Sequence, residues 1–186
     1  GGVLIIGGEK FGLALFDEAG NYRNYRSNTS CAAGTGSFLD QQARRLNLPD
    51  IETFSSIAVT NTGGTPKIAS RCSVFAKTDL IHAQQEGYSL SEICDGLCEG
   101  LARNVADTLF GDDKIPGDVV MAGGVSLNRA VVKHLSSITG AGVVVHEYSH
   151  LFGAIGASIL LLEEFNSGYA VSAPVKNFSG LFRNEK

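Results

Sequence analysis

The order of two apolar periodicities along the chain constrains its fold more than any other feature of the sequence. The first quarter consists of short apolar runs separated by turn residues, at residues 3–6, 11–16 and 22–26. Such runs predict a meander of three antiparallel strands. From Ser37 the apolar residues recur at helical spacing, and after residue 118 short apolar runs alternate with helical stretches. A chain that begins with strands, continues with helices and ends with alternating strands and helices is expected to form an α/β fold with a mixed sheet.

The helical stretches have recognisable boundaries. The clearest start is Ser89, because Glu92 follows three residues later and completes a capping box before a long apolar stripe. We expect this helix to reach about Phe110. Further helices are expected from Ser37 to before Pro49 and over residues 74–85, 127–135 and about 153–166, with strands at 118–122 and 143–146. We therefore expect one lobe over residues 1–165 and a poorly structured tail or linker over 166–186.

The totals exclude several classes of function. The 186 residues carry a formal net charge of -4, so no broad basic face is available for nucleic acid. No stretch approaches the roughly 18 to 20 apolar residues of a membrane span, and no signal-peptide pattern opens the chain. We expect a cytoplasmic protein. Its four cysteines are too few for a disulfide-stapled scaffold of this length, which leaves metal binding, catalysis or burial as their roles.

The most informative segment joins a cysteine to a glycine-rich turn just before a predicted helix. Cys31 is followed by Gly34, Thr35 and Gly36, and the helix then begins. A helix start presents unpaired N–H groups and a partial positive charge, so it favours an anion. The anion could be a phosphate or a cluster held by thiolates. A plain tight turn explains the glycines equally well.

A second cysteine precedes a predicted helix in the same way. Cys72 lies 41 residues after Cys31, and two helix starts could hold both thiolates in one positive environment that supports metal or cluster ligation. An iron-sulfur cluster usually needs four thiolates, so two from each subunit of a two-fold dimer would complete the set. The alternative is two buried, inert cysteines. Cys94 and Cys98, one helical turn apart near an apolar stripe, are expected to be core residues.

Two diglycine segments are further candidates for ligand binding. Gly123 and Gly124 follow the strand at 118–122, and ligands gather at the carboxyl ends of strands in α/β sheets. Gly7 and Gly8 lie between the first two strands and could face phosphate. A strand-to-helix connection and a hairpin turn, respectively, are the alternatives.

Taken together, these segments resemble the activator ATPases of 2-hydroxyacyl-CoA dehydratases and benzoyl-CoA reductases, the BadF/BadG/BcrA/BcrD type. The resemblance covers nearly all of residues 3–164. Its most specific parts are Cys-Ala-Ala-Gly-Thr-Gly-Ser-Phe at 31–38, Ser-Arg-Cys-Ser-Val-Phe at 70–75 and Ala-Gly-Gly-Val-Ser-Leu-Asn at 122–128. The resemblance implies the actin-like ATPase fold, in which two RNase H-like lobes clasp a nucleotide, and this chain is similar to the second lobe.

The family also implies cofactors and partners. Its members are homodimers bridged by one [4Fe-4S] cluster, and ATP with magnesium drives a low-potential electron from an upstream donor into a CoA-ester dehydratase or reductase. By position, the resemblance makes Cys31 and Cys72 the cluster ligands. The residues that it implies for the nucleotide are Gly7, Gly8, Gly34, Thr35, Gly36, Gly123, Gly124 and Asn128.

Two departures from the family pattern limit that expectation. Nothing in the chain matches the family's first phosphate loop, and Ile5 stands where the second phosphate segment usually has an aspartate. The missing acid affects magnesium binding, and we expect the chain alone to be a poor ATPase. Two other classes stay open: a sugar- or acyl-kinase-like phosphotransferase lobe, and a non-catalytic nucleotide-binding or dimerisation module of a larger protein.

Overall fold

The computed structural model describes residues 1–28, 35–69, 73–111, 115 and 117–168. Cys31, Gly34 and Cys72 therefore lie outside the described residues. The chain divides into two compact units, Gly1–Phe152 and Gly153–Lys186. The first unit contains the sheet and five of the helices.

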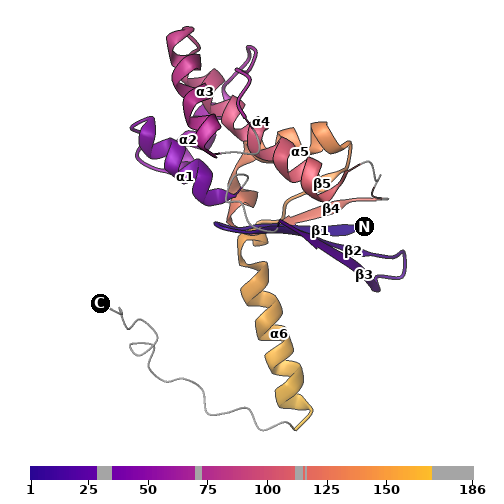
Figure 1. Ribbon diagram of the computed structural model, residues 1–186. Helices are drawn as coiled ribbons and strands as arrows, with labels where there is room; N and C mark the ends of the chain where they lie inside the picture. The colour runs from indigo at the N-terminus through magenta and orange to yellow at the C-terminus, as the bar shows by residue number, and fades with distance from the viewer. Residues whose placement is uncertain (29–34, 70–72, 112–114, 116, 169–186) are drawn as a thin grey trace. The chain divides into compact units, whose positions relative to one another are not determined.

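The first unit is built on a mixed five-stranded sheet with the strand order β3-β2-β1-β4-β5 (Figure 1). Three antiparallel strands form the predicted meander: β1 (Gly2–Ile6), β2 (Phe11–Phe16) and β3 (Tyr22–Ser27). The strands β4 (Val119–Ala122) and β5 (Val143–Val144) extend the sheet in parallel to β1. The α/β class and the mixed sheet predicted from the sequence are confirmed.

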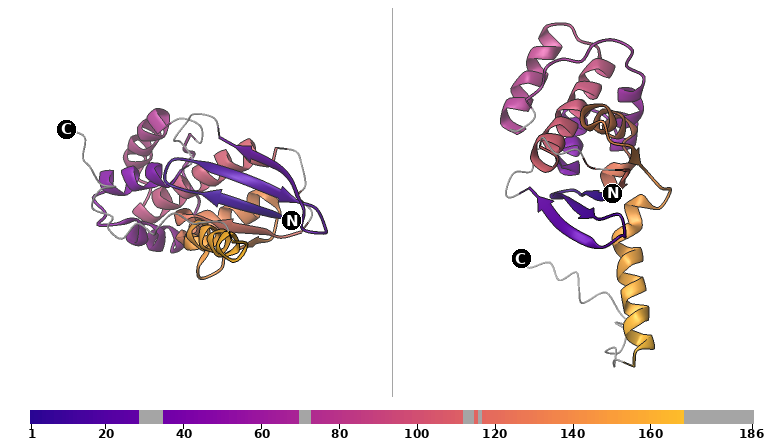
Figure 2. Two further views of the ribbon diagram at one scale, coloured as in Figure 1. Left: turned by 90° about the horizontal axis from the view of Figure 1, so that it is seen from below. Right: turned by 90° about the vertical axis from the view of Figure 1, so that its right-hand side faces the viewer.

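Five helices lie on one face of this sheet (Figures 1 and 2). They are α1 (Gly36–Arg45), α2 (Ile51–Val59), α3 (Ser73–Gln85), α4 (Leu90–Leu109) and α5 (Arg129–Thr139). The core forms between sheet and helices, where Leu4, Leu13 and Met121 from three adjacent strands are fully buried. Burying such side chains contributes about 1.5–3 kcal/mol each.

Side-chain caps set the starts of α2 and α4. Ser89 and Glu92 form the predicted capping box of α4, with each side chain bonded to the other residue's backbone N–H. Asp50 caps α2 by accepting a hydrogen bond from the N–H of Thr53 at 2.7 Å, and this bond is the first cause that lowers the pKa of its carboxyl. Helix α2 was not predicted from the sequence.

The segment from residue 61 to 69 runs along α4. Two glycines of α4 make this approach possible: a Cβ at Gly96 would come within 3.0 Å of Pro66, and one at Gly100 within 3.6 Å of the Ile68 carbonyl oxygen. Thr65 also donates a hydrogen bond of 2.6 Å to Glu99. The segment is thus held to the helix by packing and by a polar contact.

After β4 the chain forms the single-turn helix η1 (Gly124–Leu127), and after β5 it forms η2 (Ser149–Leu151). Helix α6 (Phe152–Asn166) makes up most of the second unit's described part. No helix in the described ranges has the length and apolar character that crossing a membrane requires.

Candidate functional site

A cavity of about 320 Å³ opens where four segments of the first unit meet. The turn after β1 provides one wall, α1 and α2 provide two more, and η1 closes the fourth. The lining residues are Gly7, Gly8, Gly36, Leu39, Asp40, Ile51, Glu52, Ser55, Gly124, Val125, Leu127 and Asn128. Glycine backbone on several sides, apolar side chains and a few polar groups are typical of a small-molecule site.

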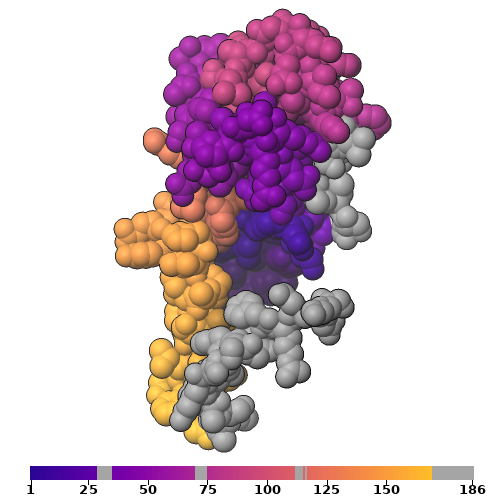
Figure 3. Space-filling view, turned by 90° about the vertical axis from the view of Figure 1, so that its left-hand side faces the viewer, coloured from indigo at the N-terminus to yellow at the C-terminus, as the bar shows by residue number. Residues whose placement is uncertain are grey.

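The turn after β1 and the start of α1 are joined by hydrogen bonds. The N–H of Gly36 donates to the Gly7 carbonyl at 2.9 Å, and the N–H of Ser37 donates to the Gly8 carbonyl at 3.0 Å. In the space-filling view the purple surface of α1 accordingly lies above the indigo surface of the N-terminal strands (Figure 3). A Cβ on Gly36 would lie 3.3 Å from the Gly7 carbonyl oxygen and 3.2 Å from Val125, so glycine permits this approach. These two N–H groups of α1 are paired within the protein.

Gly123 and Gly124 differ in role although they are neighbours. Gly123 has a φ of +90°, and a Cβ there would collide with the backbone of Ile6. It therefore serves the close approach of η1 to β1. Gly124 lines the cavity, and a Cβ added to it would meet no atom within 4 Å. Only Gly124 presents open backbone to a ligand.

The structure brings five of the eight nucleotide-site residues implied by the family resemblance to the cavity wall: Gly7, Gly8, Gly36, Gly124 and Asn128. Gly123 and Thr35 are not among the lining residues. Thr35 precedes α1 and is fully buried. Gly34 lies outside the described residues, so its predicted role stays a prediction.

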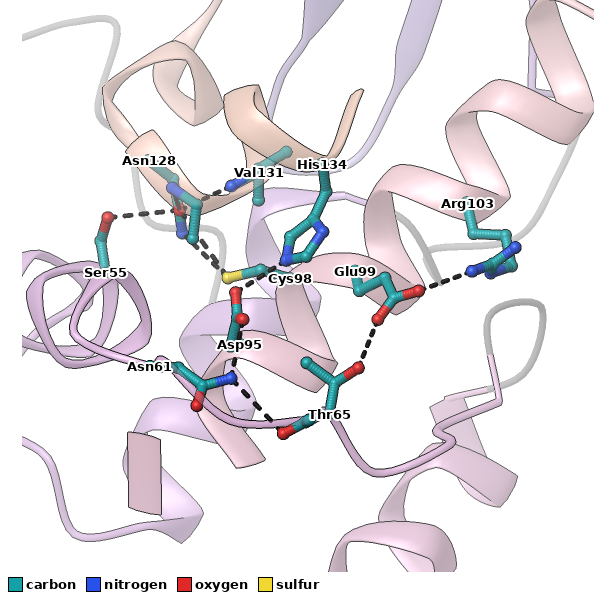
Figure 4. Close-up of polar contacts among 12 residues, drawn as sticks. Ser55, Asn61, Thr65, Asp95, Cys98, Glu99, Arg103, Asn128, Val131 and His134 are labelled. Atoms are coloured by element: carbon teal, nitrogen blue, oxygen red, sulfur yellow. Dashed lines mark hydrogen bonds and ion pairs between the residues drawn. The ribbon is translucent and has the colours of Figure 1, made fainter. Parts of the chain in front are cut away.

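Asn128 lines the cavity, and its side-chain amide contacts residues of α2, α4 and α5 (Figure 4). Its Oδ1 accepts hydrogen bonds of 3.1 Å from the N–H groups of Ala130 and Val131, which caps α5. Its Nδ2 lies 3.6 Å from the Sγ of Cys98 on α4. The hydroxyl of Ser55 on α2 donates to Oδ1 at 3.2 Å. One amide thus ties α2, α4 and α5 together beside the cavity.

Sequence reasoning missed the side chains that α1 and α2 contribute, which include Asp40, Glu52 and Ser55. The signal for α2 was present: Asp50 is a good N-cap, and Ile51, Phe54 and Ala58 follow at helical spacing. The carboxylates of Asp40 and Glu52 belong to exposed residues at the cavity, whereas Ser55 is buried. The charged groups of the described wall are therefore acidic.

A second polar cluster joins α4 to α5 and to the 61–69 segment. The buried carboxylate of Asp95 contacts Nε2 of His134 at 2.7 Å and accepts a hydrogen bond of 3.0 Å from Asn61. One turn further along α4, hydrogen bonds from Thr65 and from Arg103 lower the pKa of Glu99. The contacts of Asn61 and Thr65 hold the 61–69 segment against α4, and none of the residues in this cluster lines the cavity.

Cys94 and Cys98 lie in the core, as predicted from their position on the apolar stripe. Burial raises the pKa of Cys94 to about 12, and it raises the pKa of Cys98 further still. Both thiols therefore stay protonated at neutral pH, which disfavours metal ligation. Within the described ranges, no three His, Cys, Asp or Glu side chains gather in a group that could hold a metal ion.

This geometry suits a nucleotide. Leu39, Ile51, Val125 and Leu127 give the cavity apolar side chains that suit a planar base, and Gly7, Gly8 and Gly36 add backbone to the wall beside Val125. Ile5, at the position of the family's aspartate, belongs to β1 and is 43% exposed. It brings no carboxylate to the turn at Gly7.

Comparison with known proteins agrees with this description. The 2-hydroxyisocaproyl-CoA dehydratase activator of Clostridioides difficile is 30% identical over 87% of this chain and 60% of its own length. The (R)-2-hydroxyglutaryl-CoA dehydratase activating ATPase of Acidaminococcus fermentans is 32% identical over 84% of this chain and 59% of its own length. The chain thus spans about 60% of the length of these relatives.

Solved structures show the same likeness in three dimensions. The Clostridium difficile activator with bound ADPNP superposes with a TM-score of 0.82 at 28% identity, over 92% of this chain and 63% of that one. The component A structure from Acidaminococcus fermentans gives a TM-score of 0.78, over 86% and 60% of the two chains. The expected actin-like ATPase fold is confirmed. Residues 1–160 match the family model, and the chain belongs to the BadF/BadG/BcrA/BcrD ATPase family.

Proposed function

We propose that this chain is one lobe of an ATP-dependent activator that passes electrons to a CoA-ester dehydratase or reductase. The observation that carries the proposal is the cavity between the Gly7–Gly8 turn, α1, α2 and η1. Its apolar and glycine-lined walls fit a nucleotide, and a relative of the same fold binds ADPNP. Relatives of this chain activate CoA-ester dehydratases, which supports the same class of acceptor here.

The electron carrier in this proposal is a [4Fe-4S] cluster shared by two copies of the chain, with Cys31 and Cys72 of each copy as ligands. The family relationship supports this assignment. Cys94 and Cys98 are poor ligands because they are buried and their pKa values are raised. Cys31 and Cys72 are the other two cysteines of the chain. Iron bound as such a cluster supplies one-electron chemistry at low potential.

We propose that ATP binds between this lobe and a second lobe of the family's fold. Binding energy that differs between two lobe arrangements can shift the chain's conformation and, through it, the cluster's surroundings. The relatives' greater length leaves room for the second lobe. Efficient hydrolysis is accordingly expected only where both lobes are present.

Anaerobic reconstitution with iron and sulfide tests the proposal. We expect about four irons per two chains, with the absorption of thiolate-to-iron charge transfer. Cys31→Ser and Cys72→Ser should each abolish cluster formation, and Cys94→Ala is the matched control that should retain it. Iron that binds equally well to all three variants would contradict the ligand assignment. ATP binding by the unmodified chain, measured by calorimetry, tests the nucleotide site separately.

A further inference from the structure

We propose that Asp79 is a positioning residue for Cys72, because it ties the chain that precedes Cys72 to the helix that follows it. The inference rests on the proposed function, which makes Cys72 a cluster ligand, and adds the side chain that orients this ligand. Asp79 belongs to α3 and is half-buried. Its Oδ2 accepts a hydrogen bond of 2.8 Å from the backbone N–H of Ala69, which lies three residues before Cys72.

This hydrogen bond closes a short loop of the chain. Ala69 and Asp79 are 10 residues apart, and Cys72 lies between them in the sequence. Since residues 73–79 belong to α3, the bond fixes Ala69 relative to the start of that helix. Only three residues join these two points, and a chain extends at most about 3.6 Å per residue. Fixing Ala69 on α3 therefore restricts where Cys72 can lie.

The 61–69 segment is also fixed at its start, by a buried carboxylate on α4. Asp95 is 4% exposed. One of its oxygens accepts a hydrogen bond of 3.0 Å from Asn61, and the other lies 2.7 Å from Nε2 of His134 (Figure 4). A carboxylate only accepts, so Asn61 and His134 are the donors. Asn61 Oδ1 in turn accepts a hydrogen bond of 2.9 Å from the N–H of Gly63, which orients the Asn61 amide with its nitrogen toward Asp95.

The middle of the segment is held between these two ends. Thr65 donates to Glu99, and Pro66 packs so closely on Gly96 that a Cβ there would lie 3.0 Å from it. These contacts hold the segment to α4. The hydrogen bond to Asp79 adds the link to α3 and lies closest to Cys72 along the chain. Its loss should therefore affect the ligand more directly than the loss of a contact with α4.

Two substitutions separate the contact of Asp79 from its charge. Holding the Ala69 N–H needs only an acceptor. Asparagine keeps an acceptor oxygen without the charge, whereas leucine has a similar size and no acceptor. Asp79→Asn should therefore preserve the positioning, and Asp79→Leu should abolish it. Lys77→Leu is the matched control, because Lys77 is exposed on the same helix.

Hydrogen exchange of the iron-free chain, followed by NMR, tests the contact itself. The Ala69 amide should exchange slowly in the unmodified chain, in Asp79→Asn and in Lys77→Leu. In Asp79→Leu it should exchange about tenfold faster or more, as expected for the loss of a hydrogen bond to a charged group. Equal exchange in Asp79→Leu and the unmodified chain would overturn the inference. An Ala69 amide that exchanges at the rate of an unfolded peptide in the unmodified chain would do the same, and that measurement needs no variant.

Loss of iron to a chelator from the anaerobically reconstituted chain tests the consequence for the cluster. Removing a group that orients a metal ligand typically lowers metal affinity by 10–100-fold, so Asp79→Leu should lose iron at least about tenfold faster than the unmodified chain. Asp79→Asn should stay within about threefold, because it keeps the acceptor. The decay of the thiolate-to-iron absorption follows the same loss.

The outcomes separate this inference from the proposed function. Equal rates of iron loss from Asp79→Leu and the unmodified chain would overturn the role of Asp79 and leave the cluster assignment intact. Equally fast loss from Asp79→Asn and Asp79→Leu would assign the effect to charge and overturn the positioning role as well. An unmodified chain that forms no cluster would overturn both proposals.

Discussion

Gly123 and Gly124 are neighbours, but only Gly123 lies where a side chain would collide with the backbone. Gly123 has a φ of +90° and ψ of 170° and sits against the Ile6 backbone, whereas Gly124 faces open space. Gly123→Ala should lower the free energy of unfolding by about 3 kcal/mol or more, because strained backbone and a backbone collision add. Gly124→Ala should change it by less than about 0.5 kcal/mol. Urea denaturation of both variants measures the difference, and equal losses would refute the assigned roles.

The buried thiols predict a dependence of stability on alkaline pH. The pKa of Cys94 is raised from 9.0 to about 12 in the folded chain. Between these two pH values the unfolded chain loses the thiol proton, whereas the folded chain keeps it. Stability from this group is full below about pH 8.5 and falls as the pH rises toward 12. The loss should approach about 1.4 kcal/mol per pH unit for each such thiol.

Denaturation at pH 8 and pH 10 checks this, and Cys94→Ala is the comparison. The variant should show a shallower decline than the unmodified chain, because one of the two buried thiols has been removed. The difference between the two slopes isolates the thiol from tyrosines and lysines that titrate in the same range. Parallel slopes would show that Cys94 ionises as freely in the folded chain as in the unfolded one.

Sequence reasoning placed Asn128 near a ligand but could not find its environment. Its role as the α5 cap is local, whereas its contact with Ser55 depends on α2 and α5 meeting in space, because 73 residues separate the two side chains. Ser55 therefore could not have been singled out from the sequence.

Helix α4 and the 61–69 segment show the same dependence on packing at the scale of elements. Replacing a helical glycine by alanine usually stabilises a helix by about 1 kcal/mol. At Gly100 the added Cβ would lie 3.6 Å from the Ile68 carbonyl oxygen, an ordinary contact, so Gly100→Ala should be neutral or stabilising. At Gly96 it would lie 3.0 Å from both the ring and the carbonyl oxygen of Pro66, so Gly96→Ala should be destabilising by about 1–3 kcal/mol.

Thermal or urea denaturation of the two variants checks the prediction. Hydrogen exchange adds a second reading, because Gly96→Ala should speed exchange in the 61–69 segment while Gly100→Ala should leave it unchanged. Equal stability of the two variants would mean that the 61–69 segment does not pack tightly against α4 at Gly96. The paired substitution separates helix propensity from packing, since propensity changes equally at both positions.

The elements that sequence reasoning recovered are those with strong local signals. The three-stranded meander and the capping box of α4 were predicted at nearly the observed positions. Helix α5 was expected over 127–135 and instead spans Arg129–Thr139. Residues 124–127 form η1 because Gly123 takes a positive φ, and Gly140 in the left-handed region ends α5. Boundaries set by a glycine's dihedral angles are hard to place from apolar spacing alone.

On the scale of the whole molecule, the mixed sheet could be predicted because strand and helix patterns change order along the chain. The family could be predicted because three motifs keep their order over nearly the entire chain, and the match to residues 1–160 confirms it. The cavity could not, since it arises where the β1 turn, α1, α2 and η1 meet.

The shared cluster makes assembly a prediction of its own. Each chain has two candidate ligands, Cys31 and Cys72, and a [4Fe-4S] cluster takes four thiolates, so a loaded cluster requires two chains. Light scattering under anaerobic conditions should give the 19.6 kDa mass of one chain before reconstitution and twice that mass afterwards. Cys72→Ser should stay at the single-chain mass, and Cys94→Ala should double as the unmodified chain does. A single chain that carries a complete cluster would rule out the bridge, because its other ligands would then have to come from groups within that chain.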